Sequence, residues 1–486
     1  MAEAGAGNHN FQVLTLKNTA QRVFSLDDQI EFARLSGNWN PIHLDPVFAR
    51  RTLAGQVVVH GIHAALWALD VWAIGVQKRI QFRTFRASFV RPMPVSAALT
   101  VSVAREHENS VKVDVLCGSS LGATIEADWV SDDHRAVATT VDTGLPPRTE
   151  PVERSVDAIA GCAGAFPLRF DARIAGVLFP ALAVAVPDEQ LASLASTSRI
   201  VGVECPGLHS LLFEADLVAR SGVVSSDVGY RVGHVDARFG LVRLQIETPA
   251  FTGTVGALLR PKPIAQATCA AVRKEVQQSE FAGVTALIVG GSRGLGEVAA
   301  KILASGGADV TLTYHRGETD AARVVSDIVA SGGIARSMPL DVLDGRHGLA
   351  DSLRPDFLYY FASPFIVSGT REQFSPELLT QFCAYYLAGF ERIVETLASR
   401  GLRQIFYPSS VLIDDMPLEM REYVIAKAAG ETLCAFLERR FPGLHIVRPR
   451  LPRMATDQTA AQRPVKNADP LPVILREIRA FHGRAG

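Results

Sequence analysis

A change of pattern near residue 280 constrains the fold of this chain more than any other feature. From there onward, helix-like segments alternate with short apolar runs rich in β-branched or aromatic residues, at 286–289, 309–314, 357–360, 404–407 and 445–447. This alternation is typical of a parallel sheet whose helices cover both faces. We therefore predict an α/β doubly wound domain over residues 281–486.

The first half of the chain has a different pattern. Long stretches of alternating apolar and polar residues, such as 86–104 and 242–246, predominate over helical stretches. Alternation of this kind predicts half-buried antiparallel strands, so we expect an α+β arrangement in which an antiparallel sheet packs on a helix. The polar, charged segment 273–280 is the expected linker to the second half.

An internal repeat divides the first half. Gly61-Ile-His-Ala-Ala-Leu66 corresponds to Gly207-Leu-His-Ser-Leu-Leu212, and each copy precedes two or three strand-like runs. We predict two copies of one sheet-plus-helix unit, at residues 8–147 and 148–272, with a boundary in the proline-rich segment 145–151.

Composition excludes several classes of function. The 486 residues exceed what one hydrophobic core usually organises, and the formal net charge of −1 gives no basic surface for nucleic acid. The six scattered cysteines form no CxxC pair and no metal-like grouping with histidine, so we expect buried free thiols and no metal site. The longest apolar run, 174–186, is broken by Pro180 and is too short to span a bilayer. With no signal-peptide pattern at its N-terminus, the chain is expected to be cytoplasmic, with no membrane partner.

A glycine-rich turn follows the first apolar run of the second half. Val289-Gly-Gly-Ser-Arg-Gly-Leu-Gly296 has the GxxxGxG spacing and lies between a predicted strand and a predicted helix. Such a turn lets a pyrophosphate approach the backbone and the N-terminus of the helix. We expect a dinucleotide to bind through Gly290, Ser292, Arg293, Gly294, Leu295 and Gly296.

Three further residues accompany this turn. Tyr423-Val-Ile-Ala-Lys427 lies on a predicted helix, and Ser410 precedes the tyrosine by thirteen residues, just after a predicted strand. With the glycine spacing, they resemble the short-chain dehydrogenase/reductase family and its Rossmann-type domain, over roughly residues 282–460. The resemblance implies that Tyr423 donates a proton to a ketone, that Lys427 lowers the pKa of this phenol and binds the nicotinamide ribose, and that Ser410 holds the substrate oxygen. The alternative is a chance YxxxK on an ordinary helix.

The end of the second predicted strand bears on the cofactor. Where NAD-specific members of this family carry a carboxylate, the chain has Tyr314-His315-Arg316, and Arg293 lies in the glycine turn. Two arginines suit a 2′-phosphate, so NADPH is the expected cofactor. Alternatively, Arg316 is a solvated turn charge and Arg293 caps a helix.

The chain departs from this family at other positions. Asp341 and Val342 resemble the adenine-contacting pair after the third strand, but of the Asn-Asn-Ala-Gly motif after the fourth strand only Ala362 remains. Tyr386 stands where the family has a helix asparagine that links the lysine to a water relay. These changes concern the proton relay and the shape of the substrate pocket rather than the Ser/Tyr/Lys chemistry.

The N-terminal part of the chain carries a second resemblance. Asn40-Pro-Ile-His-Leu-Asp-Pro46, Val59-His-Gly61 and Phe89-Val-Arg-Pro92 occur in the order seen in MaoC-like hot-dog proteins, the (R)-specific enoyl-thioester hydratases and 3-hydroxyacyl dehydratases. The resemblance implies a long helix wrapped by an antiparallel sheet, with His43 over a thioester tunnel and the backbone N–H of Gly61 polarising the thioester carbonyl. The second copy lacks the histidine motif and resembles the non-catalytic half of a double hot dog.

One position of this site differs from the family. Reversible hydration needs groups that exchange protons, and the family supplies an aspartate five residues before its histidine, where this chain has Asn38. An amide can hydrogen-bond a water but cannot exchange a proton near neutral pH. Asp45 resembles a loop-fixing residue and is expected to point away from His43. Either His43 is catalytic beside Asn38, or it lines an acyl-binding groove.

The two resemblances together predict a bifunctional enzyme of fatty-acid or polyketide type. It would reduce 3-oxoacyl thioesters with NADPH and carry a hydratase/dehydratase-like half for 3-hydroxyacyl thioesters. The expected partner is an acyl thioester of acyl carrier protein or coenzyme A, and the expected assembly is a homodimer. Two alternatives remain: a ketoreductase whose hot-dog half only binds acyl chains or dimerises, and a binding scaffold, which hydride-transfer assays would separate from the others.

Overall fold

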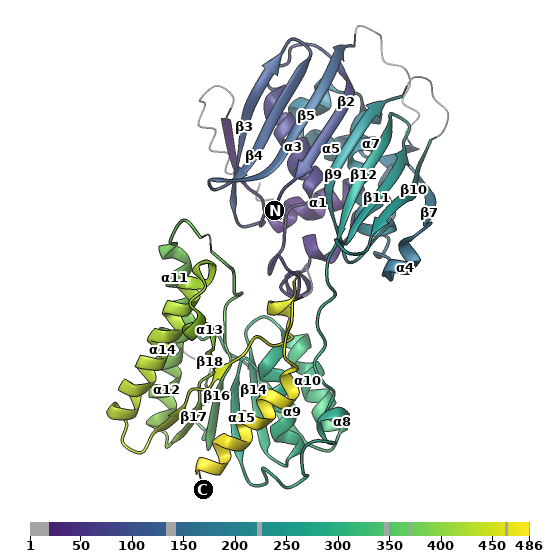
Figure 1. The fold of residues 1–486 in the computed structure, drawn as a ribbon. Helices are drawn as coiled ribbons and strands as arrows, with labels where there is room; N and C mark the ends of the chain where they lie inside the picture. The colour runs from purple at the N-terminus through teal and green to yellow at the C-terminus, as the bar shows by residue number, and fades with distance from the viewer. Residues whose placement is uncertain are drawn as a thin grey trace, which may run out of the picture. The chain divides into compact units, whose positions relative to one another are not determined.

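The computed structural model describes residues 19–132, 142–220, 226–344, 349–369, 371–461 and 465–485. The chain divides into two compact units, Met1–Lys262 and Pro263–Gly486 (Figure 1). The two copies expected in the first half therefore share one unit. The expected linker, 273–280, belongs to the second unit instead, because Val276 and the following Phe281 are buried in its core.

The first unit contains a ten-stranded antiparallel sheet in the order β1-β3-β4-β5-β2-β9-β12-β11-β10-β7. Its strands are β1 Thr19–Val23, β2 Ile80–Phe89, β3 Ala98–His107, β4 Ser110–Cys117, β5 Ser120–Ser131, β7 Ala163–Pro167, β9 Ser210–Ala219, β10 Asp227–Asp236, β11 Leu241–Glu247 and β12 Phe251–Leu259. The pairing of β2 with β9 joins two five-stranded halves. In each half the first strand along the chain lies at the outer edge and the second lies at the centre, so the strand order is repeated.

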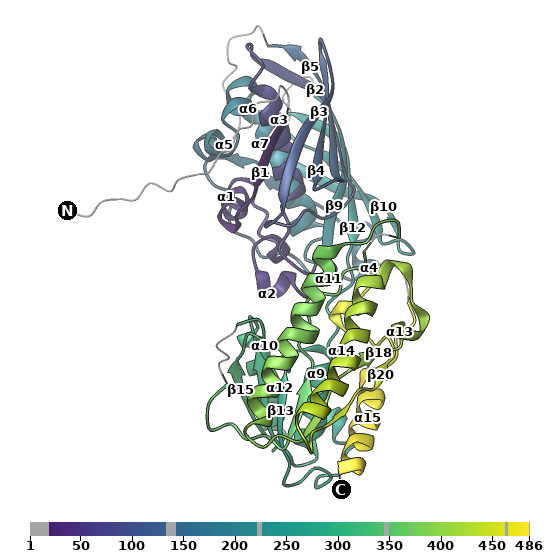
Figure 2. The ribbon, with the colours of Figure 1, turned by 90° about the vertical axis from the view of Figure 1, so that its left-hand side faces the viewer.

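Helices cover one face of this sheet (Figure 2). The helices of this unit are α1 Leu26–Ser36, α2 Pro46–Ala49, α3 Gly61–Ala73, α4 Val156–Ile159, α5 Ala172–Leu178, α6 Pro180–Ala185 and α7 Asp188–Arg199, and those on this face include α1, α3, α5, α6 and α7 (Figure 2). Helix α3 packs on β3, β4 and β5, and α7 contacts α3 and β12. Because α3 is apolar on nearly all sides, as from Ala64 to Leu69, it is buried in a core that both halves share.

The structure corrects two predictions for this unit. The expected strand 86–104 is two strands, since β2 ends at Phe89 and β3 begins at Ala98, with Pro92 and Pro94 in the connection. The expected repeat also has the wrong register: residues 61–66 begin α3, whereas residues 210–212 lie in β9. The helix of the second half that corresponds in position to α3 is α7.

The second unit has a six-stranded parallel sheet in the order β15-β14-β13-β16-β17-β19. Its strands are β13 Thr285–Val289, β14 Asp309–Tyr314, β15 Ile334–Pro339, β16 Phe357–Tyr360, β17 Gln404–Phe406 and β19 His445–Val447. Numbered along the chain, the order is 3-2-1-4-5-6, that of the doubly wound dinucleotide-binding fold.

Helices lie on both faces of the parallel sheet (Figure 1). One face carries α9 Gly294–Ser305, α10 Glu318–Ala330 and α15 Pro470–Ala485, and the other α12 Phe390–Ala398 and α14 Arg421–Arg440. Alternate residues of β13 enter two different cores: Ala286 and Ile288 pack with α9, whereas Leu287 and Val289 pack with α12. The unit also contains α8 Cys269–Val272, α11 Pro376–Cys383, α13 Leu412–Asp415 and the short strands β18 Ser409–Ser410 and β20 Arg450–Leu451.

Three further observations concern the described residues as a whole. No helix among them combines the length and the apolar character needed to cross a bilayer. They contain no cluster of three or more histidine, cysteine or acidic side chains placed to hold a metal ion. All six cysteines are free, but only Cys205, Cys269 and Cys434 are fully buried.

Candidate active sites

The glycine-rich turn joins β13 to α9. Gly290 and Gly294 have positive φ angles of 84° and 59°, which favour glycine. A Cβ on Gly290 would lie 2.8 Å from the backbone nitrogen of Ala362, and one on Gly296 would clash with the carbonyl oxygen of Gly290. A Cβ on Gly294, in contrast, would have Thr456 Cγ2 at 3.9 Å as its nearest neighbour. The turn thus closes on itself but leaves room beside Gly294, at the helix N-terminus, where an anion is favoured.

Three other residues of the turn have less direct roles in its geometry. Ser292 is buried, and Leu295 is half-buried at the start of α9. The guanidinium of Arg293 points to a carboxylate, with 3.7 Å between Arg293 Nη1 and Asp457 Oδ2. Arg293 is also the N-cap residue of α9, although its side chain makes no capping hydrogen bond.

Ser410, Tyr423 and Lys427 come together beside the carboxyl end of the parallel sheet. Ser410 lies in β18, just after β17, and the other two residues lie one turn apart on α14. The Ser410 hydroxyl hydrogen-bonds the Tyr423 side chain, and all three side chains are buried. Ser409, in contrast, donates to Glu431 Oε1 at 2.5 Å. The structure therefore places Ser410 rather than Ser409 beside the tyrosine.

Burial determines the protonation of this group. It raises the pKa of Tyr423 to about 12, against the smaller lowering effect of the bond with Ser410. It also lowers the pKa of Lys427 to about 7, so the amine carries only part of a charge near neutral pH. Burial and the bond with Ser410 account for the direction of the Tyr423 pKa shift, and a lowering of this pKa by Lys427 stays a prediction.

Tyr386, which replaces the family asparagine, contacts this lysine. It lies in a π-helical turn, Ala384–Gly389, a local irregularity that often marks functional sites. Lys427 Nζ lies 3.9 Å from the centroid of the Tyr386 ring and donates to the Pro408 carbonyl at 2.8 Å. The Tyr386 hydroxyl lies 2.7 Å from Ser363 Oγ. The face of an aromatic ring thus occupies the position expected for an amide and a water.

The residues expected at the adenosine half of the cofactor differ in the contacts that they already make within the protein. His315 Nε2 lies 3.4 Å from Asp341 Oδ2, and both side chains are partly exposed. Arg316 is exposed, and no ion pair of its guanidinium is recorded within the described parts of the chain. Val342 is a core residue whose carbonyl accepts a hydrogen bond of 2.8 Å from Arg392. Of the two arginines expected at a 2′-phosphate, Arg316 is therefore the more available.

In the first unit, His43 is held beside the start of α3. It ends a 3₁₀ turn, Pro41–His43, and its Nδ1 lies 2.8 Å from the Val58 carbonyl, so Nδ1 is the protonated nitrogen. Its ring stacks on His60 with 3.8 Å between the ring centroids. Burial lowers the pKa of His43 to about 4, so the imidazole is neutral and its Nε2 can accept a proton. Because Gly61 follows His60, the structure brings His43 and the helix N-terminus together.

Asn38 is fixed within the same loop. Its Nδ2 donates to Ser198 Oγ of α7 at 2.9 Å, and its Oδ1 accepts from the backbone N–H of Asn40 at 3.1 Å. The side chain also packs against Gly202, where any Cβ would clash with it. The amide nitrogen thus ties the loop to the second half of the unit, and the amide oxygen fixes the conformation within the loop. Asp45 accepts from the backbone N–H of Val47 at 2.7 Å as the N-cap of α2, which is the loop-fixing role expected for it.

Sequence reasoning missed one charged residue of this site. Arg260, just after β12, is 5% exposed, and its charge is one cause of the lowered pKa of His43. Its Nη2 donates to the Leu208 carbonyl at 2.5 Å, and Asn40 Nδ2 donates to the same oxygen at 3.2 Å. A lone arginine at the end of a strand carries no motif, so only the fold reveals its proximity to the histidine loop.

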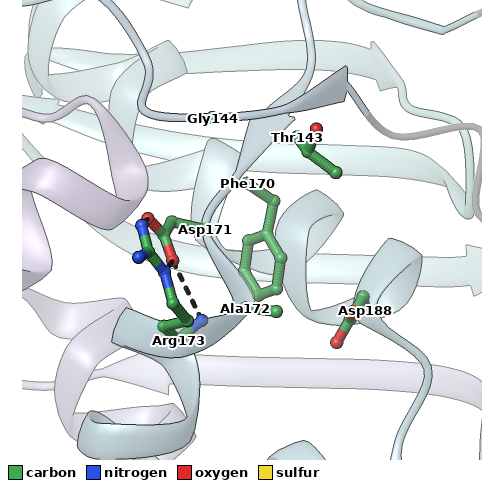
Figure 3. Close-up of a pocket in the computed structure, with 7 residues that line it drawn as sticks. All are labelled: Thr143, Gly144, Phe170, Asp171, Ala172, Arg173 and Asp188. Atoms are coloured by element: carbon green, nitrogen blue, oxygen red, sulfur yellow. Dashed lines mark hydrogen bonds and ion pairs between the residues drawn. The ribbon is translucent and has the colours of Figure 1, made fainter.

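A surface pocket of about 390 Å³ lies elsewhere in the first unit (Figure 3). Its lining includes Phe170, Asp188 and an ion pair of 3.0 Å between Arg173 Nη2 and Asp171 Oδ2. None of the residues expected to be catalytic or to bind the cofactor lines this pocket. It is therefore separate from the His43 loop and from the Ser/Tyr/Lys group.

Comparison with known proteins supports the resemblance of the N-terminal part to MaoC-like proteins. Residues 13–124 match the family described as MaoC like domain, so the chain contains a MaoC-like domain. A stretch of 60 residues is 42% identical to the fatty acid synthase beta subunit stcK of Emericella nidulans, and it covers 12% of this chain and 3% of that protein. The match thus spans a small fraction of that much longer relative.

Solved structures similar to this chain include two bacterial reductases. A dehydrogenase/reductase from Sinorhizobium meliloti is 25% identical with a TM-score of 0.36, over 42% of this chain and 88% of that one. A 3-oxoacyl (acyl-carrier-protein) reductase from Agrobacterium tumefaciens, solved with NADP bound, is 23% identical with a TM-score of 0.32, over 37% and 74%. The assignment of the second unit rests on its own strand order and site residues.

Proposed function

We propose that the second unit is an NADPH-dependent ketoreductase that acts on 3-oxoacyl thioesters. The observation that carries the proposal is the grouping of Ser410, Tyr423 and Lys427 beside the carboxyl end of a sheet with the order 3-2-1-4-5-6. In open α/β sheets this edge is where ligands bind. The named relatives, a fatty acid synthase subunit and a 3-oxoacyl reductase, favour acyl-thioester substrates.

The residues of the glycine turn fit a dinucleotide. The room beside Gly294 suits a pyrophosphate at the N-terminus of α9, and Gly290 and Gly296 keep the turn tight enough for this approach. Arg316 would bind the 2′-phosphate, with His315 and Asp341 on the adenosine side. NADPH supplies the hydride when bound.

The chain itself supplies the proton. Tyr423 stays protonated across the physiological range because of its pKa of about 12, so it can donate its proton to the ketone oxygen. Ser410 holds that oxygen beside the phenol. Lys427, when protonated, favours the phenolate that remains, and it is held on the ring of Tyr386.

The first unit is proposed to be a double hot dog that binds an acyl thioester. The repeated strand order, with α3 and α7 in corresponding places, supports this assignment. His43 is neutral, its Nδ1–H donates to the Val58 carbonyl, and its Nε2 is left unprotonated, while the Gly61 N–H at the start of α3 would polarise the thioester carbonyl. Dehydration of the 3-hydroxyacyl product would then follow reduction in one chain, in fatty-acid or polyketide metabolism.

A second candidate function is a ketoreductase whose hot-dog unit only binds acyl chains or forms a homodimer. The observation that favours it is Asn38, since both polar atoms of its amide are used to hold the loop. Product analysis separates the two candidates, because only the first yields an enoyl thioester.

The ketoreductase assignment is tested by measuring the oxidation of NADPH, through its absorbance, in the presence of a 3-oxoacyl thioester. Tyr423→Phe should keep NADPH binding but lose about 10²–10⁴-fold in turnover, as expected for a lost general acid. Ser409→Ala is the matched control, because Ser409 is bonded to Glu431 instead of the tyrosine. Unchanged turnover in Tyr423→Phe would remove the assignment.

A further inference from the structure

Arg260 is a buried cation that has unused hydrogen-bonding capacity. Its Nε lies 3.4 Å from the Ser210 carbonyl and its Nη2 lies 2.5 Å from the Leu208 carbonyl. Its Nη1 is inaccessible to solvent and has no hydrogen-bond partner among the described residues. A buried donor of a charged group left without a partner costs several kcal/mol at most sites, so such groups are often functional.

No carboxylate compensates this charge within the described parts of the chain. Glu153, an acid beside His209, binds Lys262 Nζ at 2.5 Å and lies 3.4 Å from His209 Nε2. Burial lowers the pKa of Arg260 only to about 10, so the guanidinium stays charged at neutral pH. The positive charge is therefore available to a ligand.

The position of Arg260 ties it to the histidine loop. Its Nη2 shares the Leu208 carbonyl with Asn40 Nδ2, and the Asn40 carbonyl accepts from the backbone N–H of His43 at 3.0 Å. The Leu208 carbonyl thus links the Arg260 guanidinium to Asn40, which lies three positions before His43. The neighbouring positive charge of Arg260 also favours the neutral form of His43.

The chemistry of the proposed substrate defines what this cation can hold. A 3-hydroxyacyl thioester has two oxygens near the reacting carbons, and the thioester oxygen is assigned to the Gly61 N–H. The oxygen at C3 remains, and a guanidinium can donate to it without giving up its own proton. Asn38 is held in the loop by its Nδ2 bond to Ser198 and its Oδ1 bond from Asn40, and it carries no charge to offer this oxygen.

We propose that Arg260 is a positioning residue of the hot-dog site that binds, through Nη1, the C3 oxygen of a 3-hydroxyacyl thioester beside His43. The inference rests on the proposed acyl-thioester function of the first unit. It makes the site selective for acyl groups oxygenated at C3 over saturated acyl groups of the same length.

The test compares binding of 3-hydroxyhexanoyl-CoA and hexanoyl-CoA to the full chain by calorimetry, in a His43→Ala background that prevents turnover. With Arg260 in place, 3-hydroxyhexanoyl-CoA should bind this site about tenfold to a hundredfold more tightly than hexanoyl-CoA. This is the range expected for one charged hydrogen bond. Arg260→Gln should abolish the preference. Arg260→Lys keeps a buried charge but has no donor at the position of Nη1. The preference for the 3-hydroxyacyl ligand should therefore fall in this variant too. Lys262→Gln is the matched control, because Lys262 is exposed and bonded to Glu153.

The outcomes separate the two claims. Gly61→Pro, at the start of the helix, identifies binding to the first unit, because it should weaken that binding. If neither ligand shows binding that depends on Gly61, the acyl-thioester function itself fails. If both ligands bind and Arg260→Lys or Arg260→Gln leaves the preference unchanged, the function stands and the role of Arg260 is overturned. If Arg260→Gln does not fold, as judged by circular dichroism, the Arg260→Lys result decides.

Discussion

Lys427 has surroundings that differ from the pattern of the reductase family that the second unit resembles. Its ammonium lies 3.9 Å from the centroid of the Tyr386 ring, and burial lowers its pKa to about 7. The cation–π contact favours the charged form and so opposes burial. If Lys427 must be protonated for reduction, the rate should be highest below pH 7 and should fall as pH rises through the pKa.

This account predicts distinct effects of two substitutions of Tyr386. Tyr386→Leu removes the ring, so the pKa of Lys427 should drop and the midpoint of the rate profile should move down by about half a unit to one and a half units. Tyr386→Phe keeps the ring and loses only the bond to Ser363, so its midpoint should stay. The measurement is kcat/KM for ketone reduction against pH. Identical midpoints in all three proteins would contradict the role of the ring.

The two arginines at the cofactor site lead to a second prediction. Arg316 is exposed, whereas Arg293 faces Asp457 at 3.7 Å. Arg316→Ala should weaken NADPH binding by about tenfold to a hundredfold and leave NADH binding unchanged, because only NADPH carries the 2′-phosphate. Arg293→Ala should have a smaller effect on this ratio. Fluorescence titration with both nucleotides measures it, and an equal loss for NADPH and NADH in Arg316→Ala would make Arg316 an ordinary surface charge.

Asn38 leads to a third prediction, on the first unit. Asn38→Asp keeps the acceptor for the Asn40 N–H, and the Ser198 hydroxyl can turn to donate, so the loop should retain its conformation. The substitution adds a second group that can exchange protons. We expect dehydration of 3-hydroxyacyl thioesters to rise within about 10²–10⁴-fold, and His43→Ala to abolish the gain.

The control for Asn38→Asp is Asn38→Ala, which removes both hydrogen bonds and adds no acid. It should lower the stability of the unit without raising dehydration. If Asn38→Asp binds acyl thioesters but gains no activity, the groove lacks more than one carboxylate and serves only to bind acyl groups.

At the scale of elements, α3 and α6 are joined by one carboxylate. Asp70 Oδ1 accepts from the backbone N–H groups of Ala181 and Leu182, both at 2.8 Å, and so caps α6 from the neighbouring helix. Burial raises the pKa of Asp70 from 3.8 to about 6. The folded state therefore binds this proton more tightly than the unfolded state, and the contribution to stability is full below about pH 4 and is lost as pH rises to about 6.

Asp70→Asn tests this linkage, because the amide keeps an oxygen for the two N–H groups but does not ionise. Relative to the wild type, the variant should gain stability between pH 4 and pH 6, by up to about 3 kcal/mol. Comparison of the two proteins cancels the opposite effect of the buried histidines, whose lowered pKa values weaken the fold as pH falls. Urea unfolding followed by tryptophan fluorescence is suitable, since all four tryptophans lie in the first unit. A constant difference across this pH range would contradict the linkage.

The elements also show what sequence alone could and could not provide. The central strands β13, β14 and β16 were predicted because both of their faces are buried, which requires continuous apolar runs. The edge strand β15 has no such run, since most of its side chains are exposed, and only the family resemblance implied a third strand before Asp341. The helix α7 was also missed, because its buried face is rich in serine and threonine, whose hydroxyls bond carbonyls of the same helix.

The site residues divide in the same way. Ser410, Tyr423 and Lys427 were found from their spacing because two of them share a helix and the third ends a strand. The contacts of Arg293 with Asp457, of Lys427 with Tyr386 and of Arg260 with the histidine loop join residues far apart in sequence. Only tertiary packing creates these contacts, so no local sequence pattern predicts them.

At the scale of the whole molecule, the proposed function assigns consecutive steps on one substrate to the two units. Reduction of a 3-oxoacyl thioester would use the buried tyrosine and the glycine turn of the second unit, and dehydration would use the neutral histidine beside a helix N-terminus in the first. Each unit has its own hydrophobic core. Substitutions at one site should therefore leave the chemistry of the other unchanged.

The most direct test of the central claim is a single incubation of the full chain with a 3-oxoacyl-CoA and NADPH deuterated at the transferred position, followed by mass spectrometry. The expected products are a 3-hydroxyacyl-CoA that carries one deuterium at C3, and an enoyl-CoA that retains this deuterium and accumulates more slowly or only in Asn38→Asp. Recovery of the unreduced ketone, or of a reduced product without deuterium, would contradict the claim that the chain is a ketoreductase of acyl thioesters.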